Sequence, residues 1–252
     1  MEQRPYHDRA WLKEHLREER AEADLLGEIR EALFGAQDGL VSTLAVVSTV
    51  GGATNDRFSI LIAGIAAALA GIFSMAAGEY LSSKSQREIY VAQIRKEREE
   101  VTERPGEAEA EVAYMLEGEG LEPEASKRVA AELARKPEVL LNTMVEKELG
   151  IPVAEGRNAL EGALVMGAAF GLASVVPIVA YVFVDPVQAF PISMALSLAV
   201  LFAMGVVKSR WTEANPVRSG VEVVVLAAFA GLAGWFFGQL LPGFLGVDAP
   251  TV

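Results

Sequence analysis

An aspartate inside an apolar segment is the first residue whose type and place point to chemistry. Asp38 lies about five residues into 33–52, a stretch almost free of other charges. A carboxylate at that depth in a bilayer costs at least ~2.5–3.5 kcal/mol, so it normally faces a polar path or a partner group. The position predicts either a ligand for a cation that crosses the membrane or a structural carboxylate bonded to a serine or backbone group.

A methionine in the second apolar segment, 58–81, lies at a matching depth. Met75 is six residues from the end of that segment, so at 1.5 Å per residue both it and Asp38 lie roughly 8–9 Å into the membrane. A carboxylate together with a thioether suits a transition metal. Glu79 lies on the same helix face as Met75, one turn nearer the end of this segment. Its carboxylate fits three roles: a metal ligand, a proton acceptor or a side chain that snorkels to the interface. Taken alone, Met75 also fits a packing methionine.

A third set of candidates lies in the segment 82–158, whose 17 acidic residues are all glutamates. Several candidate ligands recur three or four residues apart, which places them on shared helix faces: Glu97 with Glu100, Glu107 with Glu111, and Met144 with Glu148. The functional interpretation is a cluster of hard oxygen ligands for divalent cations, with Met144 favouring a softer transition metal. The alternative is a solvated acidic helical domain, and the spacing does not decide between them.

The elements that must position these groups are membrane-spanning helices. Charge is nearly absent from five stretches, each long enough to cross a ~30 Å hydrocarbon core: 33–52, 58–81, 159–184, 189–207 and 221–241. We therefore expect an all-α membrane protein with five transmembrane helices and a cytoplasmic three-helix insert between the second and third. The expected domains are an N-terminal amphipathic helix (1–32), the first two spans (33–81), the glutamate-rich insert (82–158), and the last three spans with an external tail (159–252).

The basic residues predict the orientation. Of the 22 Lys and Arg residues, only Arg57 falls on the side opposite to the others. Loops rich in Lys and Arg stay in the cytosol, which predicts a cytosolic N-terminus and insert and an external C-terminus. No short apolar core follows a basic start, so we expect no cleaved signal peptide. The short loops and compact N-terminus suit a prokaryotic plasma membrane.

Composition excludes several classes of function. The chain of 252 residues is 52% apolar with a net charge of −12, which disfavours a nucleic-acid partner. The absence of cysteine excludes disulfides, thiolate metal sites and cysteine nucleophiles. The sequence has no Gly-rich phosphate loop, Ser/His/Asp set or HExxH motif. We therefore expect neither an enzyme nor a bound cofactor, and the expected partners are membrane lipid and divalent metal ions.

Two motifs resemble the vacuolar iron transporter family. Phe34-Gly-Ala-Gln-Asp-Gly-Leu-Val-Ser-Thr lies in the first span, and Ser74-Met-Ala-Ala-Gly-Glu-Tyr-Leu-Ser-Ser-Lys lies in the second. The glutamate-rich insert that ends in Met144-Val-Glu-Lys-Glu-Leu-Gly extends the resemblance over nearly the whole chain after about Gly27. The sequence departs from the plant members in having Ala67 where they carry a glutamate, and Glu79 where they carry a small residue.

The resemblance implies a homodimer of five-span protomers with its path at the dimer interface. It implies proton-coupled export of Fe2+, and often of Mn2+, from the cytosol. Asp38 and Met75 match the family's membrane-embedded metal site. The positions matching its cytoplasmic metal-binding domain are Glu97, Glu100, Glu111, Met144 and Glu148, together with Glu107, for which Glu109 competes. The alternatives are a metal-sensing membrane protein without flux and a calcium/proton exchanger.

Overall fold

The computed structural model describes residues 9–150 and 158–245, and every regular element in these ranges is an α-helix. The elements in chain order are α1 (Arg9–Ala53), α2 (Arg57–Glu103), α3 (Pro105–Gly118), α4 (Pro123–Ala134), α5 (Pro137–Lys147), α6 (Ala159–Phe183), α7 (Pro186–Thr212) and α8 (Pro216–Leu245). Five of them, α1, α2, α6, α7 and α8, are long and apolar enough to cross a membrane. The predicted all-α fold with five spans is confirmed.

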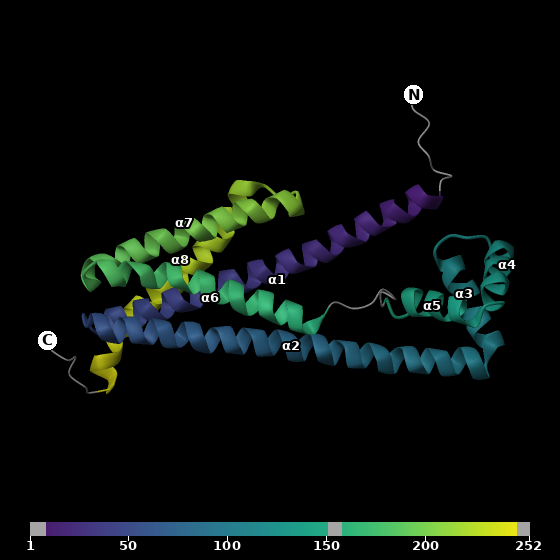
Figure 1. Cartoon of the computed structure of the whole chain (residues 1–252), viewed down its shortest axis with the longest axis horizontal. Helices are drawn as coiled ribbons and strands as arrows, with labels where there is room; N and C mark the ends of the chain where they lie inside the picture. Colours follow the sequence, from purple (N-terminus) through teal and green to yellow (C-terminus); the bar gives the residue numbers. More distant parts are fainter. Residues whose placement is uncertain (1–8, 151–157, 246–252) are drawn as a thin grey trace, which may run out of the picture. The chain divides into compact units, whose positions relative to one another are not determined.

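The chain divides into two compact units. One contains Met1–Tyr80 and Leu160–Val252, and the other contains Leu81–Ala159. The first unit holds α1, α6, α7, α8 and the first part of α2, and we call it the span unit. The second holds the rest of α2 with α3, α4 and α5, and we call it the insert (Figure 1).

The first helix is longer than a single span. We expected an N-terminal amphipathic helix over 1–32 that leads into the first span, and in the structure α1 runs unbroken from Arg9 to Ala53. The reason is local, because this stretch contains no proline, and Gly27 lacks any second helix-ending signal beside it. The first eight residues and the predicted C-terminal tail beyond residue 245 lie outside the described residues.

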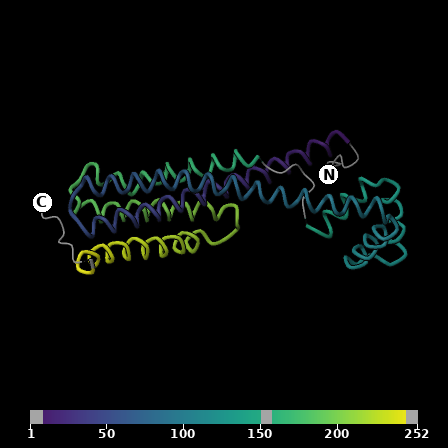
Figure 2. Tube along the Cα trace, turned by 90° about the horizontal axis from the view of Figure 1, so that it is seen from below, coloured from purple at the N-terminus to yellow at the C-terminus, as the bar shows by residue number. Residues whose placement is uncertain are grey.

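Glycines bring α1 and α6 together at the level of their backbones. A Cβ atom on Gly35 would collide with the carbonyl oxygen of Met166, and one on Gly39 would collide with that of Phe170. Only a glycine stripe allows two helices to approach so closely. Because the numbers rise together on both helices, α1 and α6 run in the same direction, side by side in Figures 1 and 2.

A buried hydroxyl pair extends this contact by one more turn. Thr43 Oγ1 donates to Ser174 Oγ at 3.0 Å, and Ser174 Oγ donates to the Phe170 carbonyl oxygen at 2.8 Å. Both hydroxyl side chains are fully buried. Each α1 residue of the stripe therefore faces the α6 residue 131 positions later along the chain.

Small residues also bring α2 against α6, in the opposite direction. A Cβ atom on Gly64 would lie 3.1 Å from Ile178 Cγ1, and one on Gly167 would lie 3.0 Å from Ala76 Cβ. The numbers fall along α6 as they rise along α2, so the two helices are antiparallel. These small residues of the second span thus make contacts within the chain.

The far half of α1 packs on α8 in the same manner. A Cβ atom on Gly234 would lie 2.7 Å from the Ala45 carbonyl oxygen, and one on Gly238 would collide with that of Thr49. Helix α1 is therefore held at backbone level along two faces, by α6 and by α8.

The insert has an apolar core of its own. Its three short helices each begin with a proline at the first helical position, where the missing N–H has no intrahelical acceptor. The fully or nearly fully buried core residues come from α2, α3, α4 and α5: Val101, Ala108, Val112, Ala113, Leu116, Ala130, Leu140, Leu141, Met144 and Val145. This core fixes α3 against the end of α2 and so positions the glutamates that follow.

Candidate metal sites

The packing of α1 and α2 on α6 fixes the relative depth of Asp38 and Met75. Asp38 directly precedes Gly39, which contacts Phe170, and Met75 directly precedes Ala76, which contacts Gly167. Phe170 and Gly167 are less than one turn apart on α6. Asp38 and Met75 therefore lie within about one helical turn of each other in depth, ~5 Å.

The Asp38 carboxylate has no partner within the described parts of the chain. Ser42 Oγ donates a hydrogen bond to the Asp38 backbone carbonyl oxygen, at 2.6 Å, and leaves the carboxylate itself unbonded. The side chain is half-buried. Phe34 lies four residues earlier on the same face and is 58% exposed. Asp38 thus lies on a face of α1 that its own chain covers only in part.

Met75 and Glu79 lie one turn apart on one face of α2, and both are half-buried. Their face and the Asp38 face belong to the same unit. A carboxylate, a thioether and a second carboxylate are thereby available near one end of the spans. This donor set suits a divalent transition metal better than calcium, which takes oxygen ligands only.

In the insert, three of the predicted glutamates meet. Carboxylate oxygens of Glu100 on α2 and of Glu107 and Glu111 on α3 all lie within 4.8 Å of one another. Two oxygens on opposite sides of a bound divalent cation are about 4–5 Å apart. The three carboxylates are therefore spaced as ligands of a single ion would be.

The electrostatics of this cluster show mutual repulsion. Burial, and then the neighbouring Glu100, Glu148 and Glu107 carboxylates, raise the pKa of Glu111 to about 7. Burial, and then Glu148 and Glu100, raise the pKa of Glu97 above its usual range. Glu97 and Glu148 therefore adjoin the three clustered glutamates, and we call all five residues the insert cluster. A cation bound among them would relieve the repulsion.

One oxygen of the insert cluster is buried without a hydrogen-bond partner. Arg104 donates to Glu100 Oε2 at 3.1 Å and to Glu107 Oε2 at 2.7 Å, and so bridges the solvent side of the cluster. Glu100 Oε1 is buried, and among the described residues no Lys, Arg, hydroxyl or backbone N–H donates a hydrogen bond to it; the neighbouring Glu111 can do so only when protonated. Buried polar atoms are rarely left unsatisfied, and an unseen ion or water is an ordinary reason.

The predicted ligands Met144 and Glu148 differ in burial. Met144 is fully buried in the apolar core of the insert, whereas Glu148, one turn later, follows the end of α5 and is exposed. The thioether is therefore turned toward the core. Of the two competing positions on α3, Glu107 joins the cluster, while Glu109, two residues along, lies on another face.

Sequence reasoning missed Glu31, a buried carboxylate near the start of the first span. It is only 6% exposed, and a Cβ atom on Gly162 would lie 2.8 Å from its Oε2 atom. Glu31 precedes Gly35 and Gly39 by four and eight residues. That spacing is the signal that could have assigned it to the face packed on α6.

Comparison with known proteins agrees with this arrangement. The model of the VIT family matches residues 29–239. The chain belongs to the VIT family. Members of this family are membrane transporters of metal ions and not enzymes. The metal is their transported substrate, and the family match indicates no cofactor.

Several relatives align with most of the chain. Vacuolar iron transporter 1 of Tulipa gesneriana is 34% identical over 82% of this chain and 84% of its own length. The protein of the same name from Eucalyptus grandis is 33% identical over 83% and 85%. Protein CCC1 of Saccharomyces cerevisiae is 28% identical over 84% of this chain and 69% of the yeast protein.

Proposed function

We propose that this VIT-family protein exports Fe2+, and also Mn2+, from the cytosol in exchange for protons. The insert cluster captures the ion, which then passes to Asp38 and Met75. The names of the relatives support iron as the substrate. The observation that carries transport rather than sensing is the Asp38 carboxylate, half-buried in a span, level with Met75 and without a partner in the described chain.

The coupling to protons follows from the ligands. Carboxylates hold a metal ion only when they are deprotonated, so binding releases protons and protonation releases the metal. An ion that loses its water to Asp38 and Met75 would leave toward the more acidic side. Glu79, one turn from Met75, is the second carboxylate available for this exchange.

The proposed orientation places the N-terminus and the insert in the cytosol and the C-terminus outside, in a prokaryotic plasma membrane. Its support is the distribution of Lys and Arg, of which Arg57 alone lies between the first two spans. We further propose a homodimer whose path runs between the protomers. The partly uncovered face of α1 that carries Asp38 and Phe34 supports this assembly.

The test is flux into proteoliposomes, with Fe2+, Mn2+ and Ca2+ competing in one assay and with a pH gradient, acidic inside, imposed or collapsed. We expect gradient-dependent Fe2+ uptake that Asp38→Asn abolishes. Asp24→Asn is the matched control, because Asp24 lies on the exposed part of the same helix, and it should leave uptake unchanged.

Each rival predicts a different result. A metal sensor binds Fe2+ in the insert and gives no flux in any gradient. A calcium/proton exchanger transports Ca2+ preferentially and is insensitive to Met75→Leu, because calcium does not use the thioether. Undiminished Fe2+ uptake in Asp38→Asn would refute the proposed path while leaving the family assignment intact.

A further inference from the structure

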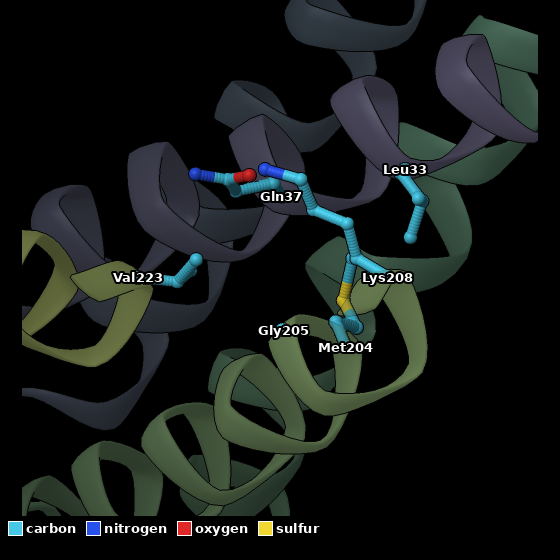
Figure 3. A pocket seen from close by; sticks show the side chains of 6 residues that line it. All are labelled: Leu33, Gln37, Met204, Gly205, Lys208 and Val223. Atoms are coloured by element: carbon cyan, nitrogen blue, oxygen red, sulfur yellow. The ribbon is translucent and has the colours of Figure 1, made fainter. Parts of the chain in front are cut away.

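A small cavity opens between α1, α7 and α8 in the span unit, and none of the candidate metal ligands lines it. Its volume is about 20 Å3. Its lining comes from α1 (Leu33, Gln37), α7 (Met204, Gly205, Lys208) and α8 (Val223). The walls are apolar apart from Gln37 and Lys208. Figure 3 shows the Lys208 side chain extending from α7 across the cavity to the Gln37 side chain of α1.

Lys208 is an unpaired cation at the end of a span. It is the first charged residue of α7 after Asp185, so its amine marks the level at which that helix leaves the hydrocarbon. Among the described residues it takes part in no ion pair, whereas Arg218 on α8 is paired with Glu222 at 3.2 Å. The Lys208 amine lies beside an apolar cavity at the end of the span, and its positive charge can therefore bind an anionic ligand.

Two neighbours extend the same surface. Arg30 precedes Leu33 by three residues and Gln37 by seven, so it lies on the cavity face of α1, one turn closer to the basic end. Trp211 follows Lys208 by three residues and is 47% exposed. Tryptophan at a span end sits at the level of lipid headgroups. Lys208, which lines the cavity, is thus accompanied by a second cation one turn further along the same face of α1 and by an interfacial aromatic ring one turn further along α7.

The cavity itself has room for about one water molecule, so a larger ligand must lie over its mouth. We propose that the surface around this mouth binds an anionic phospholipid. The lipid phosphate accepts hydrogen bonds from the Lys208 amine and the Gln37 amide, and its glycerol and first acyl carbons lie against Met204 and Val223. Basic pockets between spans at the headgroup level bind such lipids in membrane proteins. The proposal requires membrane insertion only and does not depend on metal transport.

The apolar walls decide between a lipid and a free anion. Inorganic phosphate could bind the Lys208 amine, but it has no apolar part to pack against Leu33, Met204 and Val223. A phospholipid satisfies both parts of the site, because its charge lies directly above its hydrocarbon. The position at the end of three spans places the site where such a molecule already resides.

The experiment is native mass spectrometry of the full chain in detergent, with phosphatidylglycerol and phosphatidylcholine of identical acyl chains. We expect the wild type to retain phosphatidylglycerol preferentially. Lys208→Gln should reduce that retention about tenfold or more, which corresponds to one charge-assisted hydrogen bond. Lys208→Arg should preserve it. Val223→Phe, which fills the cavity and leaves every charge in place, should also reduce it.

Arg210→Gln is the matched control, because Arg210 is an exposed cation two residues away that does not line the cavity. It should behave as the wild type. An equal loss in Arg210→Gln and Lys208→Gln would show diffuse attraction and overturn the proposal. So would equal retention of the two lipids, or displacement of phosphatidylglycerol by millimolar inorganic phosphate. Lys208 is exposed, so its variants test the site without disturbing the fold.

Discussion

The carboxyl group of Glu111 lies at the centre of the insert cluster. Its removal should therefore directly lower the affinity for a bound ion. We expect Glu111→Gln to weaken Fe2+ binding at least tenfold, since even groups that only support a ligand contribute that much. Titration calorimetry under anaerobic conditions measures it. Glu109→Gln removes the same charge from another face of α3 and should leave the affinity within about twofold. Equal effects of the two variants would indicate general electrostatic attraction and no defined site.

The pH dependence of the insert follows from the pKa of Glu111, which burial and the neighbouring carboxylates raise from its ordinary value of 4.5 to about 7. Between these two values the folded chain binds more protons than the unfolded chain, so the stability of the metal-free protein should fall as pH rises through this window. Metal binding should change the opposite way, becoming about tenfold weaker from pH 8 to pH 6 as a proton competes for the carboxylate.

Thermal unfolding of the full chain with and without Fe2+ measures both pH dependences, that of the metal-free stability and that of metal binding. The stabilisation by metal should be larger at pH 8 than at pH 6. In Glu111→Gln the pH dependence of the metal-free protein should become shallower. A metal-free protein that becomes more stable as pH rises from 6 to 8 would contradict the assigned cause.

At the residue scale, helical spacing predicted the partners that share one helix but not those that come from different helices. Glu107 and Glu111 were predicted to share a face of α3, and the structure brings them together with Glu100 of α2. Which face of α5 would turn inward depends on the whole insert core. Helical spacing therefore predicted that Met144 and Glu148 share one face. In the structure the Met144 thioether is buried in that core.

At the scale of elements, prolines and apolar runs predicted the helices because these signals are local. The sequence predicts insert helices that start at Gly106, Glu124 and Glu138, each directly after a proline. The structure starts α3, α4 and α5 one residue earlier, at the proline itself. The register between helices is not local. The sequence shows that Gly35 and Gly39 share one face of the first span, which permits a close helix contact, but only the fold shows that they meet the carbonyl oxygens of Met166 and Phe170.

This contact makes a clear prediction for Gly39→Leu. The new side chain would have to displace the α6 backbone, and such overpacking costs about 1–3 kcal/mol or more. We expect a markedly lower thermal midpoint by size-exclusion analysis after heating. Gly243→Ala on α8, where an added Cβ meets nothing within 4 Å, is the control and should not lower it. An unaltered midpoint in Gly39→Leu would mean that α1 and α6 do not meet there.

At the scale of the whole molecule, the proposed homodimer should be visible by cross-linking, because the natural chain has no cysteine to interfere. Phe34→Cys places a thiol on the Asp38 face of α1. In a twofold dimer with its path there, the two copies of this thiol face each other. A short bismaleimide should then yield a covalent dimer in membranes. Phe229→Cys, on α8 and 75% exposed, should remain monomeric. The reverse result would move the interface to α8.

The glycine stripe of α1 also fixes the rotational register of the first span against its neighbouring helices. Removing one residue between Gly35 and Thr43 would turn everything beyond it by about 100°. The hydroxyl of Thr43 would then leave Ser174, and the contacts with Gly234 and Gly238 of α8 would shift together with it. Evolution can vary the side chains around Asp38, but it has almost no freedom to lengthen or shorten this helix there.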